Sequence, residues 1–339
     1  MHRVRLLNKN IAFDVGSEGT ILEAALNAGV NYPFGCSAGS CGACKSRLID
    51  GSVELMDYSP MALTESERAA GLILACRAKP RGDCLVVYDD DPDAPNHTVR
   101  RVDARIAGHE KVTHDVVILT LEAESGFDFS PGQFATLAPA GVPPRDYSMA
   151  NLAGDGLYEF HIRRMPGGRT SSFIHESLRA GDRLAIRGPF GTAYLRDRHA
   201  GPTLLVAGGT GLAPVLSIAR AALAGKGDAP IHLYFGVRAE RDLYRTELLD
   251  ELANRHPRFE WHAVLSESTG TTTCKRGYVG KVAAEELGDL TGYKVYVAGP
   301  PVMVDATRAE ALARGALATD FHSDPFHTAA DAARAAQAP

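Results

Sequence analysis

Four cysteines place the strongest constraint on this chain of 339 residues. Cys36, Cys41 and Cys44 follow the spacing C-x4-C-x2-C, and Cys76 lies further along the chain. This pattern is typical of a 2Fe–2S cluster, in which four thiolates hold two iron ions. The residues between the first three cysteines are small, so the backbone can wind closely around a cluster and point N–H groups at its sulfurs. The sequence therefore predicts a centre that carries single electrons.

A structural zinc site and a disulfide framework are the alternatives for these cysteines. A zinc site would more naturally show paired C-x2-C knuckles. Disulfides are typical of secreted proteins, whereas the segment Met1–Leu7 is too short and too soon interrupted by charge to be a signal peptide. We therefore expect a cytoplasmic protein in which the two remaining cysteines, Cys84 and Cys274, are free thiols with packing roles.

Composition narrows the class of protein and its partners. The length suggests two or three domains, and a hydrophobic content of 45% is enough to build their cores. The formal charge of −5 gives no basic surplus that would indicate nucleic acid. No apolar run approaches the length of a membrane span. We expect a monomer with neither nucleic acid nor membrane as a partner.

The sequence around the cysteines predicts a definite order of strands and helices. Residues 3–7 and 11–15 are predicted strands, and Thr20 with Glu23 predicts a capping box at the start of a helix. Thr64 repeats the capping signal with Glu67, ahead of a short strand that delivers Cys76. Strand, strand, helix, ligand loop, strand and late cysteine together resemble a plant-type ferredoxin. The resemblance covers residues 1–90 and implies a β-grasp fold.

An acidic, proline-containing stretch follows this domain. Asp89–Asn96 should be extended and exposed, because like charges repel and proline stiffens the chain. We place the linker at residues 91–98. Strand patterns and turn signals then run through residues 99–198, as in a small antiparallel Greek-key barrel. Val116–Leu121 and Phe134–Leu137 are the clearest of these strands.

Arg-Asp-Tyr-Ser, which begins at Arg145, suits a flavin. An arginine can pair with phosphate, a tyrosine ring can lie against the isoalloxazine or ribityl chain, and a small hydroxyl can hydrogen-bond near N5. A glycine- and hydroxyl-rich turn at Gly167–Ser172 could open a helix toward a pyrophosphate. Together these motifs resemble the FAD domain of the ferredoxin–NADP reductase superfamily. The resemblance implies flavin contacts at Arg145, Tyr147, Ser148, His161, Ile162, Arg163, Gly168, Thr170 and Ser171.

The pattern of apolar residues differs over residues 199–327. Apolar strands at 203–207, 231–235, 259–265 and 293–298 alternate with helical segments at 212–223, 242–255 and 300–314. This alternation predicts βαβ units and a parallel-sheet α/β domain. The Ala-rich tail, residues 328–339, is expected to be a frayed helix or disordered.

A glycine turn, Gly208–Gly211, joins the first strand to the first helix of this domain. A helix N-terminus reached through glycines suits a pyrophosphate. Pro214 occupies the third glycine position of the Rossmann fingerprint, so the turn departs from it. The turn instead resembles the NAD(P) domain of the same reductase superfamily. The resemblance implies nucleotide contacts at Gly209, Thr210, Gly211, Arg238, Gly299, Pro300, Met303 and Phe326.

Two details of that resemblance concern hydride transfer. Members of the superfamily often carry cysteine beside the nicotinamide, before the Gly-Pro pair, where this chain has Ala298. Near the chain's end the resemblance places Asp324 beside the flavin and Phe326 over the isoalloxazine as a shield. With Ser148 these two form the implied catalytic set. Asp is less common than Glu at position 324, and the longer tail is a further departure.

The order ferredoxin, FAD barrel, NAD domain resembles the reductase components of multicomponent ring-hydroxylating oxygenases, of the naphthalene and benzoate dioxygenase type. The resemblance implies an iron–sulfur flavoprotein oxidoreductase. NADH would give two electrons to FAD, which would release them singly through the cluster to a terminal oxygenase component or its intermediate ferredoxin.

Three points stay open from the sequence. The acceptor could instead be a cytochrome P450 or a diiron monooxygenase, and a non-catalytic redox sensor is an alternative of another class. Complete FAD and NAD motifs argue against the sensor, because a sensor needs no hydride donor. Arg238 and Glu240 follow the second strand, where the adenosine ribose of the coenzyme binds. A cation there suits the 2′-phosphate of NADPH and an acid suits the ribose hydroxyls of NADH, so the preference leans to NADH, with NADPH possible.

Overall fold

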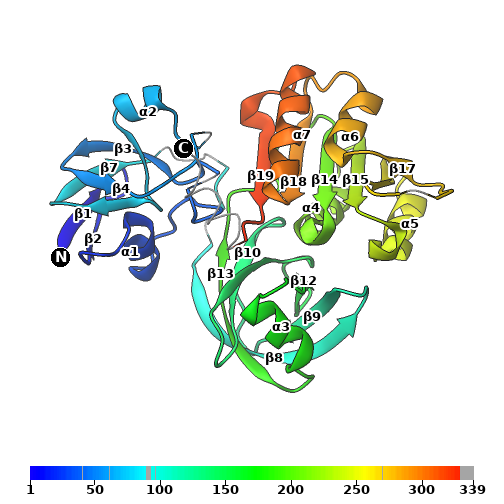
Figure 1. Ribbon diagram of the computed structural model, residues 1–339, viewed down its shortest axis with the longest axis horizontal. Coiled ribbons are helices and arrows are strands. Elements are labelled where there is room, and N and C mark those ends of the chain that lie inside the picture. Colours follow the sequence, from blue (N-terminus) through cyan, green and yellow to red (C-terminus); the bar gives the residue numbers. More distant parts are fainter. Residues whose placement is uncertain (40, 61, 89–92, 96, 269, 329–339) are drawn as a thin grey trace. The chain divides into compact units, whose positions relative to one another are not determined.

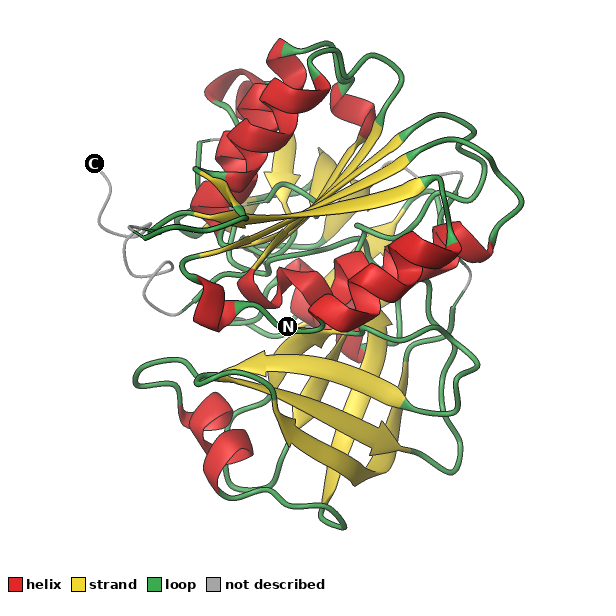
Figure 2. Cartoon of the chain, turned by 90° about the vertical axis from the view of Figure 1, so that its right-hand side faces the viewer, coloured by secondary structure: helices red, strands yellow, loops and turns green. Residues whose placement is uncertain are grey.

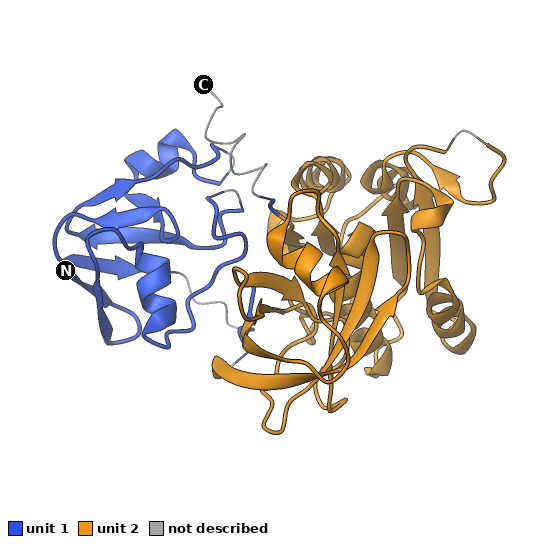
Figure 3. Cartoon of the chain, turned by 60° about the horizontal axis from the view of Figure 1, so that its bottom comes forward, with its two compact units in different colours: residues 1–96, 190–192, 327–339 blue, residues 97–189, 193–326 orange. Residues whose placement is uncertain are grey.

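The computed structural model describes residues 1–328 except 40, 61, 89–92, 96 and 269. The chain separates into two compact units, coloured differently in Figure 3. The first contains residues 1–96, 190–192 and those from 327 on, and the second contains residues 97–189 and 193–326. Much of the expected linker Asp89–Asn96 and nearly all of the expected tail lie outside the described residues. None of the described helices is long and apolar enough to span a membrane.

The first unit is built on a mixed sheet of five strands in the order β2-β1-β7-β3-β5. The pairing of β1 with β7 is parallel, and the others are antiparallel. This is the β-grasp arrangement expected for a ferredoxin domain, and a two-stranded sheet of β4 and β6 adds to it (Figure 1). The strands are β1 (His2–Leu6), β2 (Ile11–Val15), β3 (Lys45–Asp50), β4 (Val53–Leu55), β5 (Leu72–Leu74), β6 (Ala78–Pro80) and β7 (Cys84–Val87).

Two short helices complete this unit, α1 (Ile21–Asn27) and α2 (Glu65–Ala69). At α2 the predicted capping box is present in both directions. The Glu67 N–H donates to the Thr64 hydroxyl at 3.3 Å, and the Thr64 N–H donates to the Glu67 carboxylate at 2.8 Å. At α1 the structure records one arm, from the Glu23 N–H to the Thr20 hydroxyl at 3.2 Å.

The second unit begins with an antiparallel sheet of six strands in the order β11-β10-β13-β8-β9-β12. A bridge between Met149 and Phe160 brings its two edges together, so the sheet is a nearly closed barrel, as predicted (Figure 2). Its interior is packed with apolar side chains such as Phe160 and Ile186. The elements are β8 (Arg100–Lys111), β9 (Val116–Glu122), β10 (Phe134–Ala138), β11 (Arg145–Ser148), β12 (Tyr158–Arg163), α3 (Arg169–Glu176) and β13 (Arg183–Phe190).

A parallel sheet of six strands, in the order β17-β16-β15-β14-β18-β19, follows in the same unit. Helices cover both of its faces (Figure 2): α4 and α5 lie over one apolar cluster, and α6 and α7 over the other. The elements are β14 (Thr203–Gly208), α4 (Leu212–Ala224), β15 (Ile231–Val237), α5 (Thr246–Arg255), β16 (Phe259–Leu265), β17 (Lys275–Arg276), α6 (Val279–Leu287), β18 (Lys294–Gly299), α7 (Pro301–Ala313) and β19 (Phe321–Pro325), with 3-10 turns at Gly209–Gly211, Glu240–Asp242 and Ala318–Asp320.

The structure departs from the sequence prediction at four places in this part of the unit, one of which is the short strand β17, which was not predicted. The helix predicted from residue 242 begins at Thr246, because Arg245 takes a left-handed conformation with φ of 58°. Helix α6 was not predicted. Strand β19 was also not predicted, and it pairs in parallel with β18, so that Asp324 lies opposite Ala298.

Candidate redox sites

The fold of the first unit brings the four cysteines together. Strand β5 pairs with β3, and the Ala75 N–H donates to the Cys44 carbonyl at 3.1 Å. This pairing places Cys76 beside Cys44, and both are buried. Within the loop, the Cys36 N–H donates to the Cys41 sulfur at 3.4 Å. Sulfurs that accept backbone N–H groups are the arrangement a cluster requires.

Two glycines of the loop are needed for its path. Gly39 and Gly42 have φ of 77° and 76°, which side-chain-bearing residues rarely adopt. A Cβ on Gly39 would lie 2.8 Å from the Arg77 side chain, and one on Gly42 would lie 3.1 Å from the Ala62 carbonyl. The loop is therefore packed tightly against Arg77, which follows Cys76, and against the backbone at Ala62.

The thiols contact one another in two pairs. The Cys41 thiol donates a hydrogen bond to Cys36, which raises the pKa of Cys41, and the Cys76 thiol donates one to Cys44, which raises the pKa of Cys76. Charge on Cys36 and Cys41 also acts on Cys76, so the two pairs are within electrostatic reach of each other. Two pairs of neighbouring thiols beside a glycine-shaped loop fit the four ligands of a 2Fe–2S cluster.

Strand β11 presents the first group of predicted flavin residues. Arg145 is exposed at its start, Tyr147 is partly buried against the barrel core, and Ser148 is buried at its end. Burial raises the pKa of Tyr147 to about 12, so its hydroxyl stays protonated at neutral pH. An exposed cation, an aromatic ring and a buried hydroxyl on one strand fit the phosphate, ring and N5 ends of a flavin.

Ser148 makes the contact that joins the barrel to the parallel sheet at this point. Its hydroxyl donates to the Asp324 carboxylate at 2.8 Å, across 176 positions of sequence. The structure thus brings two of the three predicted catalytic residues into direct contact.

The residues predicted on β12 are engaged by other protein groups. The Arg163 Nε donates to Asp115 at 2.7 Å, and this ion pair lowers the pKa of Asp115 despite its partial burial. Ile162 is buried in the barrel core, and its carbonyl lies 2.9 Å from the His175 Nε2. The groups of β12 that remain for a ligand are therefore backbone groups and the partly exposed Arg163 guanidinium.

His161 is fully buried, and both of its ring nitrogens have partners. Its Nε2 donates to the Glu159 carboxylate at 3.0 Å, so its Nδ1 accepts the Tyr244 hydroxyl at 3.0 Å. Burial lowers the pKa of His161, which keeps the ring neutral. The side chain therefore ties the barrel to the segment before α5. Sequence reasoning missed Tyr244 and Glu159, since no motif marks a buried polar bridge.

The start of α3 carries the remaining predicted flavin residues. Gly168 caps the helix without a side-chain hydrogen bond. A Cβ there would lie 2.6 Å from the Ser171 hydroxyl. Thr170 donates to the Pro143 carbonyl at 2.6 Å, and the Ser171 hydroxyl accepts the Met165 N–H at 3.1 Å. A helix start without a side-chain cap and a glycine cradle fit a pyrophosphate.

The glycine turn after β14 is pressed against β18. A Cβ on Gly211 would lie 2.0 Å from the Ala298 carbonyl, and one on Gly208 would lie 2.4 Å from the Met303 sulfur. Gly209 has φ of 56°. Thr210 is partly exposed beside it. The turn opens α4, and a pyrophosphate site at its glycines stays a prediction.

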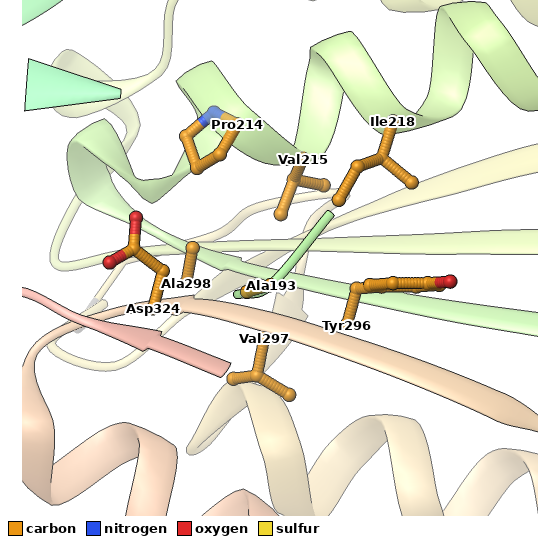
Figure 4. A pocket seen from close by; sticks show the side chains of 8 residues that line it. All are labelled: Ala193, Pro214, Val215, Ile218, Tyr296, Val297, Ala298 and Asp324. Atoms are coloured by element: carbon orange, nitrogen blue, oxygen red, sulfur yellow. The ribbon is translucent and has the colours of Figure 1, made fainter. Parts of the chain in front are cut away.

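A small cavity lies between α4 and the sheet (Figure 4). Ala298 and Asp324 stand side by side in it, on the adjacent strands β18 and β19. It is lined by Ala193, Pro214, Val215, Ile218, Tyr296, Val297, Ala298 and Asp324. The cavity is apolar apart from the one carboxylate, and it lies next to the glycine turn.

The segment after β19 closes this region. The Phe326 N–H donates to the Gly299 carbonyl at 2.8 Å, and its partly buried ring packs against the apolar cluster under α4. Pro300 caps α7 at the same point. Gly299, Pro300, Met303 and Phe326 are therefore close neighbours, whereas Arg238 lies at the end of β15, beyond β14.

Three family models match consecutive parts of the chain. A 2Fe-2S iron-sulfur cluster binding domain matches residues 4–81, an oxidoreductase FAD-binding domain residues 103–194, and an oxidoreductase NAD-binding domain residues 205–309. The reductase component of the naphthalene 1,2-dioxygenase system of Pseudomonas putida is 37% identical, over 94% of this chain and 96% of that protein. The chain belongs to the oxygenase reductase family.

Other members of the family serve different oxygenases. The reductase component of a Pseudomonas phenol 2-monooxygenase is 33% identical, over 93% of this chain and 91% of that protein. The crystal structure of the Amycolatopsis cytochrome P450 reductase GcoB covers 96% of this chain and 99% of its own, with a TM-score of 0.83 and 33% identity. The chain is thus an electron-transfer oxidoreductase with 2Fe–2S, FAD and NAD(H) as its cofactors.

Proposed function

We propose that this oxygenase reductase passes electrons from NADH through FAD and the 2Fe–2S cluster to an aromatic ring-hydroxylating oxygenase, directly or through an intermediate ferredoxin. The hydrogen bond between Ser148 and Asp324 is the observation that carries the proposal. It joins the barrel strand with the flavin motif to the last strand of the NAD domain, beside the cavity at Ala298. A hydride donor and its acceptor would meet at this contact.

Each residue has a defined part in that arrangement. Bound FAD takes up a hydride and releases electrons one at a time. Arg145 would pair with a phosphate, Tyr147 would lie against the flavin, and the start of α3 would hold the pyrophosphate. Asp324 accepts the hydrogen bond of the Ser148 hydroxyl and so holds the Ser148 oxygen in place, where its lone pairs could accept a hydrogen bond from a ligand. Phe326, whose ring packs beside the NAD domain's apolar cluster, would shield the flavin face from solvent.

The cofactor content is the first test. Purified protein should carry one FAD and one 2Fe–2S cluster per chain, and dithionite should produce a rhombic paramagnetic signal. FMN in the extract, or zinc without acid-labile sulfide, would overturn the assignment. The same sample should reduce ferricyanide with NADH at a steady rate, which a redox sensor without catalysis would not do.

The paired residues are tested by single-turnover flavin reduction. Ser148→Ala removes the hydroxyl and should slow the step by about 100-fold, which corresponds to roughly 2.7 kcal/mol of barrier. Asp324→Asn keeps a hydrogen-bond acceptor and should slow it less. Arg183→Lys, an exposed barrel change, is the control. Equal rates in all three variants would contradict a role for the pair at the reacting atoms.

The acceptor is tested by replacement of known reductases. The chain should support product formation when it replaces the reductase of the naphthalene 1,2-dioxygenase system, the source of the relative at 37% identity. It should support less turnover in the phenol 2-monooxygenase system. Higher turnover with the monooxygenase would favour the second candidate, a diiron monooxygenase partner. The structural likeness to GcoB makes a P450 the third arm of the same assay.

A further inference from the structure

A chain of two buried hydroxyls ends at one of the four cysteines. Tyr32 and Ser46 are only 1% and 2% exposed. Their hydroxyl oxygens lie 2.6 Å apart, and the Ser46 hydroxyl donates to the Cys44 carbonyl at 3.1 Å. Because a serine hydroxyl has one proton, the hydrogen bond between the two hydroxyls is donated by Tyr32. Both O–H groups therefore point along the chain toward Cys44.

The fold explains how these hydroxyls reach the cysteine loop. Ser46 lies on β3, which begins directly after Cys44 and runs between β7 and β5 in the sheet (Figure 1). Tyr32 lies in the segment that leads into the loop, where its ring packs against the Tyr88 ring with centroids 4.5 Å apart. The Cys44 carbonyl also accepts the Ala75 N–H at 3.1 Å, so both of its lone pairs are used.

Ser46 is an unusual residue for the core of the first unit. Apart from tyrosine and cysteine, it is the only buried polar side chain among the described residues of that unit. An apolar residue at this place on β3 would avoid the cost of burying a hydroxyl. The local hydrogen bond to the carbonyl two residues back satisfies the Ser46 proton, but it does not require a second hydroxyl from Tyr32. The pair therefore calls for an explanation beyond the folding of β3.

The direction of the two hydroxyls gives them an electrostatic effect on the cysteine. Burial raises the pKa of Tyr32, and negative charge on Cys44 acts in the same direction. The Tyr32 hydroxyl is therefore protonated at neutral pH and within electrostatic reach of Cys44. Two O–H dipoles in line reinforce each other in apolar surroundings. Because their positive ends face Cys44, they stabilise negative charge that is added there.

We propose that Tyr32 and Ser46 raise the reduction potential of a 2Fe–2S cluster held by the four cysteines, and so favour its uptake of an electron from the flavin. In that step the reduced flavin loses one electron, and one ferric ion of the cluster becomes ferrous. Hydrogen bonds from groups that do not themselves hold the iron set the potential of such clusters. The inference rests on the proposed function, which makes the cluster the carrier between the flavin and the acceptor. Both residues act through Cys44 and are positioning residues.

The test is a redox titration of the cluster in the full holoprotein, followed by its paramagnetic signal. Ser46→Ala removes the donor to Cys44 and should lower the equilibrium constant for cluster reduction by about tenfold, or about 59 mV for one electron. Tyr32→Phe keeps the Ser46 hydrogen bond and should lower the constant by a smaller factor. Ser46→Thr keeps a hydroxyl and should retain most of the wild-type potential.

The control for a change of stability alone is Thr20→Ala, which removes the hydroxyl that caps α1 and should titrate at the wild-type potential. Equal potentials in wild type, Ser46→Ala and Tyr32→Phe would overturn the inference, even if both variants lost the cluster faster, since faster loss indicates a purely structural role. If Ser46→Ala failed to bind a cluster, the comparison of Tyr32→Phe with wild type would decide by the same criterion. Wild-type protein that reduced cytochrome c without any cluster would instead overturn the proposed function.

Discussion

The buried bridge between Tyr244 and His161 gives a prediction whose size follows from the structure. Tyr244 is 4% exposed, and its ring packs edge-on against Phe235 with centroids 5.7 Å apart. Its hydroxyl donates to the His161 Nδ1, which can only accept because Nε2 donates to Glu159. Tyr244→Phe would keep the ring and remove only the hydroxyl. It would leave one buried acceptor without a donor.

An unsatisfied buried polar group costs about 1–3 kcal/mol. In a unit of this size, each kcal/mol lowers the melting temperature by about 2–4 °C. We therefore expect Tyr244→Phe to melt about 2–12 °C below wild type in calorimetry. Tyr278→Phe is the stability control, since that hydroxyl is on an exposed ring. Equal melting temperatures for wild type and Tyr244→Phe would refute the account of the bridge.

Three further predictions concern the NAD domain and its contact with the barrel. Ala298→Cys should speed flavin reduction by NADH in stopped flow, by no more than about tenfold or roughly 1.4 kcal/mol. A slower or unchanged rate would mean that the cavity has adapted to alanine. Gly211→Ala should abolish NADH oxidation and keep the flavin and cluster spectra, because its Cβ would lie 2.0 Å from the Ala298 carbonyl; normal activity would show that the turn can move. Burial lowers the pKa of His161 below its usual value of about 6.5. Its contribution to stability is therefore present above that pH and lost as the pH falls below it, so the loss of melting temperature between pH 7 and pH 5 should be smaller in His161→Gln.

The sequence predicted those features that local chemistry determines. The cysteine spacing, the strand and helix periods and the glycine turn each follow from neighbouring residues, and the fold class is confirmed for all three domains. Strand β19 was missed because its sequence, Phe-His-Ser-Asp-Pro, is polar and ends in proline. Its pairing with β18 supplies what the local pattern lacks.

The contacts between distant residues could not be predicted either, because they depend on tertiary pairing and not on the local pattern. The resemblance suggested Ser148 and Asp324 separately, but their hydrogen bond spans 176 positions and depends on how β19 joins the sheet. The start of α5 was misplaced because Arg245 adopts a left-handed conformation that its residue type does not indicate. Tertiary contacts determine such features, and periodicity does not report them.

The central claim is that electrons leave through the cluster, and Cys41→Ser tests it most directly. The variant should weaken or lose the cluster, because a hydroxyl is a poor substitute for a ligating thiolate. The second unit has its own core, so NADH should still reduce the flavin and ferricyanide at close to the wild-type rate. Cys84→Ser, which changes a cysteine outside the ligand set, is the control and should keep the cluster spectrum.

The deciding measurement is the rate of cytochrome c reduction by Cys41→Ser with NADH as donor. The account predicts that this one-electron activity falls to a small fraction of wild type while ferricyanide reduction persists. Cytochrome c reduction at the wild-type rate would mean that electrons leave directly from the flavin. The ferredoxin domain would then serve docking or regulation, and the proposed order of transfer would be wrong.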